Sequence, residues 1–397
     1  MKKKALSLVL ASAMVASLVG CGSSSAETET PSAAETSTTE AAATTEAATT
    51  EAATEAAATT DNSDKKIAMI TDSGDITDES FNQITWETCV AYGEANGIET
   101  QYYKPAEDTD EERINSVDLA IAEGATVVVM PGYLFGPAIA EEQGLYPDVT
   151  FIAVDVTEGD IVNLAGENVA LGDNVYICSF QEEQAGYLAG YAAVKDGYTS
   201  LGFLGGIAVP AVIRYGFGYI QGINAAAEEM GVDVDVKYYY GGQFYGDDAI
   251  TARMEGWYAD GTQVVFACGG GIYTSAVDAA AQYDGKVIGV DVDQFPKIGD
   301  ACITSAMKGL GSAVETALDA YTSGNWASIG GKSEQLGLTQ GDYLGLPTDD
   351  ASWGFKTFTK DEYETVLNGI KDGSITVSND TENQPEVGSH VTVTYVE

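Results

Sequence analysis

Residues 67–83 read Ile67-Ala-Met-Ile-Thr-Asp-Ser-Gly-Asp-Ile-Thr-Asp-Glu-Ser-Phe-Asn-Gln83, which is an apolar run, a polar turn and the start of an amphipathic segment. This order predicts a strand, a turn and a helix. Ser80 and Gln83 have the spacing of a capping box, in which each side chain satisfies a backbone N–H at the helix start. Phe81 and Asn82 then lie in the first turn, beside Asp72 at the strand end. We interpret this arrangement as the mouth of a site for a small polar ligand.

The alternation of strand and helix continues along the chain and is repeated. Predicted strands at 67–71, 100–103, 126–130 and 149–154 alternate with helices at 80–96, 109–123 and 137–146, and a second set of similar size runs from 182 to 290. Such alternation predicts parallel sheets with helices on both faces. Two lobes in tandem place the carboxyl ends of both sheets within reach of one ligand.

The remainder of the chain predicts a return to the first lobe. We expect a strand at 302–305, helices at 311–321 and 361–370, and strands at 374–377 and 391–395. The predicted organisation is a first lobe at 64–178, a second lobe at 179–300, a return to the first lobe at 301–345, and a C-terminal segment at 346–397 that adds to the hinge and the second lobe.

The N-terminus predicts export and a lipid anchor. Three lysines at 2–4 precede a short apolar stretch that ends in Leu18-Val-Gly-Cys21. This pattern is typical of a bacterial lipoprotein signal peptide at 1–20, with Cys21 as the lipidated residue and the only attachment to the cell membrane, on its extracytoplasmic face. Residues 21–63 are rich in Ala, Thr and Glu and too poor in large apolar residues to form a core, so we expect a disordered linker.

Charge and cysteine content narrow the possible partners. The formal net charge is −43, which disfavours nucleic acid and phosphate-bearing ligands and favours uncharged or cationic ones. Cys89, Cys178, Cys268 and Cys302 are far apart in the sequence and lie among apolar residues, so we interpret them as small buried thiols, with one disulfide left open by the exported location.

The sequence offers little for catalysis. His390 is the only histidine and would have to serve any Ser-His-Asp or Cys-His arrangement. Gly330-Gly-Lys-Ser333 ends like a phosphate-binding loop, but Trp326 occupies the position of its first glycine. We therefore predict no enzymatic activity, no metal and no cofactor.

Two carboxylates follow apolar runs in corresponding positions of the two halves. Asp155 ends Phe151-Ile-Ala-Val154, and Asp291 ends Val287-Ile-Gly-Val290. A carboxylate at the carboxyl end of a strand can accept hydrogen bonds from paired hydroxyls, such as those of a ribose. A lone Asp here would more often cap the next turn, but the symmetric placement makes ligand binding as credible as capping.

Aromatic residues near the ends of elements supply the other part of the predicted site. Phe81, Tyr215 and Phe244 lie at or near junctions between loops and helices. Most aromatic side chains belong to a core, whereas flat rings at the mouth of a cleft would stack on a nucleobase or a sugar face.

Several motifs together resemble the basic membrane protein family of ABC-transporter substrate-binding lipoproteins, of the purine-nucleoside receptor type. The similar segments run from about Lys65 to Val377 and include Ser80-Phe-Asn-Gln83, Tyr146-Pro-Asp-x-x-Phe-Ile-Ala-Val-Asp155, Glu183-x-Ala-Gly-Tyr-Leu-Ala-Gly190, Gly202-Phe-Leu-Gly-Gly206, Gly289-Val-Asp-Val-Asp-Gln294 and Thr304-Ser-Ala-Met-Lys308. The resemblance implies a type I periplasmic-binding-protein fold of two Rossmann-like α/β lobes joined by a multi-strand hinge.

The resemblance also implies roles for individual residues. Phe81 would be the base-stacking ring, Asn82 and Asp155 polar contacts, Asp291 the acceptor of ribose hydroxyls and Lys308 a donor near the cleft. Asp72 matches the first acidic position of the family.

The chain also departs from the family pattern. Asp78-Glu79 stands where the family commonly has Asp-Asp, and Gly269-Gly270-Gly-Ile-Tyr273 differs from the usual Gly-Gly-Thr-Gly. The second stacking ring is therefore open among Phe244, Tyr215 and Tyr273, with Gly270 as a further contact.

The resulting hypothesis is a substrate-binding protein that holds a nucleoside, with a purine nucleoside preferred, and delivers it to an ABC transporter permease. A receptor of the same fold for a sugar, a signalling furanose or a flavin-like compound is the nearest alternative. A secreted nucleoside hydrolase and a surface adhesin or sensor subunit are alternatives of other classes.

Overall fold

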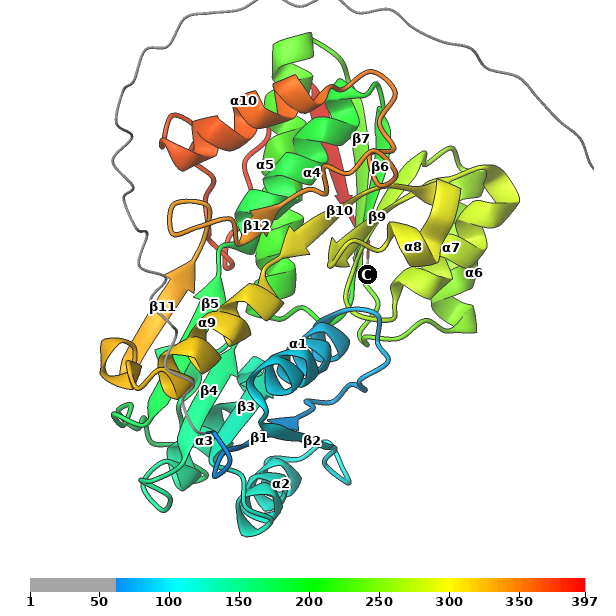
Figure 1. Ribbon diagram of the computed structural model, residues 1–397. Helices are drawn as coiled ribbons and strands as arrows, with labels where there is room; N and C mark the ends of the chain where they lie inside the picture. The colour runs from blue at the N-terminus through cyan, green and yellow to red at the C-terminus, as the bar shows by residue number, and fades with distance from the viewer. Residues whose placement is uncertain (1–61, 397) are drawn as a thin grey trace, which may run out of the picture. The chain divides into compact units, whose positions relative to one another are not determined.

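The computed structural model describes residues 62–396 (Figure 1). The predicted signal peptide, Cys21 and nearly all of the predicted linker lie outside the described residues. Within 62–396, no helix is long and apolar enough to cross a membrane. The four cysteines of this part are all buried as free thiols, as their apolar sequence neighbours predicted.

One parallel sheet of six strands forms the centre of the first lobe, called lobe 1. Its spatial order is β11-β5-β4-β3-β1-β2, with β1 at Lys66–Ile70, β2 at Glu99–Tyr103, β3 at Val127–Pro131, β4 at Thr150–Val154, β5 at Val175–Phe180 and β11 at Lys332–Leu336. The helices of this lobe are α1 (Phe81–Asn96), α2 (Asp110–Ala122), α3 (Gly136–Glu142) and α9 (Leu310–Thr322), with short 3₁₀ turns at Tyr133–Phe135, Glu158–Asp160 and Trp326–Ser328.

Both faces of this sheet are buried because successive side chains of a strand point to opposite sides. In β1, Ile67 and Met69 join the core under α1 and α9, whereas Ala68 and Ile70 join the core under α2 and α3. This explains why the inner strands of the sheet are uninterrupted apolar runs rather than alternating ones. The carboxyl ends of the strands are thereby held at one edge.

A second sheet, of seven strands, forms the centre of lobe 2. Its order is β12-β10-β9-β8-β6-β7-β13, and only β12 is antiparallel to its neighbour. The strands are β6 (Ser200–Gly205), β7 (Val234–Tyr240), β8 (Val264–Cys268), β9 (Lys286–Asp291), β10 (Cys302–Lys308), β12 (Leu344–Gly345) and β13 (Val391–Tyr395). The helices are α4 (Glu182–Lys195), α5 (Pro210–Met230), α6 (Asp248–Ala259), α7 (Tyr273–Tyr283), α8 (Phe295–Ile298) and α10 (Lys360–Lys371), with a 3₁₀ turn at Gly299–Ala301.

The chain passes between the two sheets three times, after β5, after β10 and between β11 and β12. The sequence placed the return to lobe 1 at residue 301. In the structure β10 instead pairs with β9 in the sheet of lobe 2, so the return begins at α9. The predicted strand at 374–377 is wrong. Ile375 and Val377 pack on the core from an irregular segment, and β13 already occupies the edge of β7.

Glycines set the close approach of α4 and α5, which lie side by side on lobe 2 (Figure 1). A Cβ at Gly186 or Gly190 would lie 2.1–2.2 Å from a carbonyl oxygen of α5, and a Cβ at Gly218 or Gly222 would lie 2.0–2.1 Å from a carbonyl oxygen of α4. Two small residues four positions apart on each helix therefore let the backbones touch. This contact brings the first turns of both helices together at the edge of the interlobe cavity.

We predict that Gly218→Ala destabilises the protein by about 1–3 kcal/mol, since the new methyl group meets the Glu183 carbonyl and cannot be accommodated without a shift of the helix. Gly256→Ala in α6 is the matched control. A Cβ there meets nothing within 4 Å, so it should stabilise the protein by about 0.5–1 kcal/mol through helix propensity. Urea unfolding of both variants tests this, and a Gly218→Ala protein as stable as the control would contradict the packing argument.

Candidate functional site

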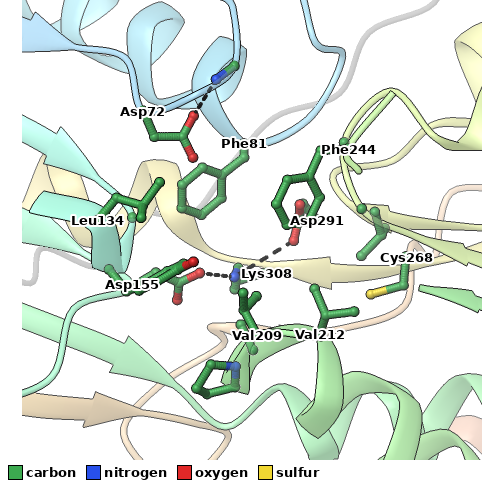
Figure 2. A pocket seen from close by; sticks show the side chains of 18 of the residues that line it. Asp72, Phe81, Leu134, Asp155, Val209, Val212, Phe244, Cys268, Asp291 and Lys308 are labelled. Carbon is green, nitrogen blue, oxygen red and sulfur yellow. Dashed lines mark hydrogen bonds and ion pairs between the residues drawn. The ribbon is translucent and has the colours of Figure 1, made fainter. Parts of the chain in front are cut away.

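A cavity of about 340 Å³ lies between residues of lobe 1 and residues of lobe 2. All nine residues that the sequence singled out for ligand binding line it: Asp72, Phe81, Asn82, Asp155, Tyr215, Phe244, Gly270, Asp291 and Lys308. Phe81 and Phe244 reach it from opposite lobes, and Lys308 lies between Asp155 and Asp291 (Figure 2). The structure thus gathers the predicted residues in one place, and their contact with a ligand remains a prediction.

The turn between β1 and α1 is held by Asp78 rather than by the predicted capping box. The Asp78 carboxylate accepts the backbone N–H groups of Ser80, Asn82 and Gln83 at 2.9–3.1 Å. The Ser80 side chain makes no capping bond, and the Gln83 amide oxygen accepts from Glu79 N–H. The prediction failed because Asp78, two residues before Ser80, offers a charged acceptor for the same N–H groups.

Asn82 uses its amide to hold Asp72. Its Nδ2 donates to Asp72 at 2.9 Å and to Asp78 at 3.0 Å, while its Oδ1 accepts the Asp72 N–H at 3.2 Å. Burial raises the pKa of Asp72 to about 6, although the Gly74 N–H and the Asn82 amide both favour the charged carboxylate. Asp72 is therefore a poorly solvated acceptor at the lobe 1 side of the cavity.

The two strand-end carboxylates share an unusual backbone conformation. Asp155 after β4 has φ 60° and Asp291 at the end of β9 has φ 63°, both in the left-handed region. Non-glycine residues rarely adopt this conformation, and Asp tolerates it better than most. Such outliers cluster at functional sites, where the surrounding structure holds them. Both turns here lie at the wall of the cavity.

The Lys308 ammonium is buried among three carboxylates. It donates to Asp155 and, at 3.3 Å, to Glu182, and it lies 3.9 Å from Asp291. Burial alone would lower the pKa of Lys308, but Asp155, Glu182 and Asp291 raise it above its ordinary value. Lys308 therefore stays charged and donates to carboxylates of the cavity wall, and its role as a donor near the cleft to a ligand remains a prediction.

A second buried pair supports this cluster. Arg214 at the start of α5 donates to Glu182 at the start of α4 at 2.5 Å. Burial tends to raise the pKa of Glu182, but Arg214 and Lys308 together bring it below its ordinary value. Burial also raises the pKa of Asp155, which Lys308 only partly offsets. The Oδ1 atom of Asp155 is buried without a hydrogen-bond partner among the described residues, so it could accept a hydrogen bond from a ligand.

The aromatic candidates occupy different environments. The Tyr215 hydroxyl donates to Asp291 at 3.2 Å, and its ring packs edge to face on Phe266. Tyr273 does not belong to the lining of the cavity. Phe244 is half-buried on a loop, where a Cβ on Gly206 would lie 2.5 Å from its ring. Gly269 and Gly270 have positive φ beside it, which a side chain would strain. Phe244 is thus the ring best placed opposite Phe81.

Charged residues of this site that the sequence did not single out include Asp78, Arg214 and Glu182. In the sequence, Asp78 stands out only as a departure from the family pattern, and Arg214 and Glu182 are not among the predicted site residues. Arg214 could have been found from the sequence. It is a basic residue next to Tyr215, an expected site residue, in a chain with only 18 Lys and Arg against 61 Asp and Glu. Glu182 had no such signal, because its role depends on the contact between α4 and α5. The single histidine, His390, hydrogen-bonds Asp233 and does not line the cavity.

Two α/β lobes with a polar and aromatic cavity between them are the architecture of the type I periplasmic-binding-protein fold. A crystal structure of an ABC transporter solute-binding protein from Aeropyrum pernix superposes with a TM-score of 0.67 at 20% identity, covering 80% of this chain and 94% of that one. A solute-binding protein from Conexibacter woesei gives 0.63 at 22% identity, covering 79% and 99%. At these identities the likeness shows the fold alone, and it confirms the predicted fold class.

The chain belongs to the family described as ABC transporter substrate-binding protein PnrA-like, whose model matches residues 65–378. It is 27% identical over 340 residues to the ABC transporter nucleoside-binding protein BmpA of Lactococcus lactis, covering 79% of this chain and 89% of that protein. It is also 27% identical over 287 residues to basic membrane protein B of Borreliella burgdorferi, covering 71% and 80%. The resemblance to the basic membrane protein family is thereby confirmed. The family implies a small-molecule ligand and a permease partner.

We predict that Asp72 titrates near pH 6 in the folded protein and that Asn82→Leu raises its pKa further, because this variant removes a donor that stabilises the charged carboxylate. Since the folded pKa lies above the ordinary value of 3.8, the stability contributed by Asp72 is full below about pH 4 and is lost as pH rises through 6. Carboxyl-carbon NMR with labelled Asp measures the titration.

Gln83→Leu is the control for this measurement, because the Gln83 side chain bonds Glu79 and Glu87 and leaves Asp72 untouched. A wild-type pKa close to 4, or a fall in the pKa in Asn82→Leu, would contradict the described environment of Asp72.

Proposed function

We propose that this protein is a lipid-anchored, extracytoplasmic substrate-binding protein of an ABC importer that holds a nucleoside, preferably a purine nucleoside, between its lobes. One observation carries the proposal. The cavity combines aromatic rings from opposite lobes with two strand-end carboxylates, and both of its cationic side chains are already paired with carboxylates.

The rings supply a site for a flat base. Phe81 from lobe 1 and Phe244 from lobe 2 line the same cavity, and glycines beneath Phe244 let its ring lie against the backbone. Any nucleobase can stack on an aromatic ring. Asp72, which lies beside Phe81, would accept a hydrogen bond from a ring N–H of the base. A volume of about 340 Å³ suits a ligand of nucleoside size rather than a peptide.

The carboxylates supply a site for a sugar. Asp155 has a buried oxygen without a partner, and Asp291 lies across the cavity from it with a carboxylate held in place by its neighbours. Vicinal hydroxyls would donate to these oxygens and satisfy them. The Asp291 carboxylate would therefore distinguish a ribose from a sugar that lacks a hydroxyl.

The charges of the cavity disfavour phosphate. Asp72, Asp78, Asp155, Asp160 and Asp291 line it, whereas its cations, Lys308 and Arg214, are bound to Asp155 and Glu182. A nucleotide would bring further negative charge to this wall without a free cation to receive it. The ligand would be enclosed by closure of the two lobes about the three connections between the sheets, with no bond broken.

Isothermal titration calorimetry with guanosine, inosine, adenosine and uridine tests the proposal. We predict that at least one purine nucleoside binds tightly, that Asp291→Ala weakens it by roughly 10- to 100-fold through loss of the hydroxyl acceptor, and that Phe81→Ala weakens it without unfolding the protein. Phe135→Leu, which changes a fully buried ring of the lobe 1 core, is the control for a general packing defect.

No heat with any nucleoside would overturn the ligand assignment and leave the family assignment intact. Heat with a free sugar, a furanose signal or a flavin-like compound would then support the alternative receptors of the same fold. Conversion of the nucleoside to base and sugar during long incubation would support a hydrolase instead. Nucleoside uptake that does not depend on this chain would support an adhesin or sensor subunit.

The anchor is tested separately. We predict that Cys21→Ala releases the protein from the membrane fraction, because lipid attached to this residue is the only membrane contact proposed. Cell fractionation with immunoblotting measures the distribution, and Cys89→Ala, a buried thiol, is the control. A Cys21→Ala protein that stays in the membrane fraction after a high-salt wash would contradict the proposal.

A further inference from the structure

The Ser80 side chain reaches from lobe 1 to the binding carboxylate of lobe 2. Its hydroxyl donates to Asp291 Oδ2 at 2.6 Å, and the two residues are 211 positions apart in the chain. Ser80 is only 1% exposed and does not belong to the lining of the cavity. Because Asp78 accepts the N–H groups at the start of α1, the Ser80 hydroxyl has no part in capping the helix.

The other oxygen of Asp291 is held from lobe 2. The Tyr215 hydroxyl donates to Oδ1 at 3.2 Å, and the Lys308 ammonium lies 3.9 Å from the same atom. Asp291 thus has one hydroxyl donor from each lobe and a backbone in the left-handed region. Its orientation is complete only when the loop that carries Ser80 lies against the end of β9.

Two neighbouring contacts hold the same loop in this position. The Gln294 amide donates to the Glu79 carbonyl at 3.1 Å and accepts the Val290 N–H, so it joins the loop to the end of β9. At the rim, Lys297 pairs with Glu79 at 2.7 Å, and both side chains are partly exposed. An exposed pair contributes little free energy. The buried bond between Ser80 and Asp291 is therefore the contact that bears directly on the binding carboxylate.

We propose that Ser80 is a positioning residue that orients Asp291 for hydroxyl groups of the ligand and makes this orientation depend on closure of the lobes. The inference rests on the proposed nucleoside function. It assigns selection of the sugar to a residue that does not touch the ligand. Discrimination between ribose and deoxyribose would then be set jointly by Ser80, on one lobe, and Asp291, on the other.

Calorimetry with guanosine, 2′-deoxyguanosine and 3′-deoxyguanosine tests the positioning role. In the wild type at least one deoxynucleoside should bind roughly 10-fold or more weakly than guanosine, since the hydrogen bond from the missing hydroxyl to the Asp291 carboxylate is lost. In Ser80→Ala we expect guanosine affinity to fall about 5- to 50-fold and the discrimination to shrink toward unity. Ser116→Ala, which removes another buried serine hydroxyl of lobe 1, should change neither quantity.

A merely structural role for Ser80 would weaken all three nucleosides equally and keep their ratio. An unchanged ratio in Ser80→Ala, with or without an equal loss of affinity, would overturn the proposal. Lys297→Gln isolates the effect of weaker contact between the lobes, because it removes the ion pair with Glu79 at the rim and leaves both oxygens of Asp291 hydrogen-bonded. It should keep the wild-type ratio.

A distance measurement tests the dependence on closure without any nucleoside. Spin labels on Glu111→Cys in α2 and Ala252→Cys in α6, both exposed, measure the distance between the two lobes. The background is a Cys21→Ala protein, whose cysteines at 89, 178, 268 and 302 are buried. Ser80→Ala should lengthen and broaden the distance distribution, whereas Ser116→Ala should not. If the wild type binds no nucleoside, the proposed function fails. An unchanged distance distribution in Ser80→Ala would overturn the role of Ser80, whatever the wild type binds.

Discussion

The buried ammonium of Lys308 is the interaction on which the cavity depends. It lies at the end of β10 and is surrounded by Asp155 from lobe 1, Glu182 at the start of α4 and Asp291 from lobe 2. A buried charge is costly unless its partners are also buried and well placed. The three carboxylates are in turn stabilised by this cation, so the cluster holds together elements from both lobes.

Local structure around the cluster follows from this requirement. The glycines of α4 and α5 let Glu182 and Arg214 meet, so that Glu182 is balanced by two cations. The left-handed turns at Asp155 and Asp291 direct both carboxylates to the cavity wall. Removal of Lys308 would leave three acidic groups facing one another. Asp155 also keeps one oxygen free for a ligand while its other oxygen is bound to Lys308.

Much of the fold could be predicted because its inner strands carry strong local signals. Apolar runs such as those of β1, β3 and β4 are buried on both faces, so they differ clearly from the helices between them. The edge strand β11 could not be predicted, since Lys332-Ser-Glu-Gln-Leu336 has one large apolar residue and is held by pairing with β5. The strand expected at 374–377 contains Ile375 and Val377, but β13 occupies the edge of β7 and the segment stays irregular.

The site was predictable where a residue's role follows from its place at a strand end or helix start, as for Asp155, Asp291 and Phe81. It was not predictable where the role depends on which groups compete in space. The Asn82 amide donates hydrogen bonds to Asp72 and Asp78. The Ser80 hydroxyl donates to Asp291, because Asp78 already accepts the N–H groups at the start of the helix. These assignments need the three-dimensional contacts, since the same residues also fit a capping box.

The proposed nucleoside function is tested most directly by mass spectrometry of the ligand that is released when protein purified from its own cells is denatured. A cavity lined by aromatic rings and carboxylates, whose cations among the described residues are paired with carboxylates, leads us to predict an intact, uncharged purine nucleoside at close to one per protein. A nucleotide, a phosphorylated sugar or another anion at that stoichiometry would contradict the account, because such a ligand would have to displace a carboxylate from Lys308 or Arg214.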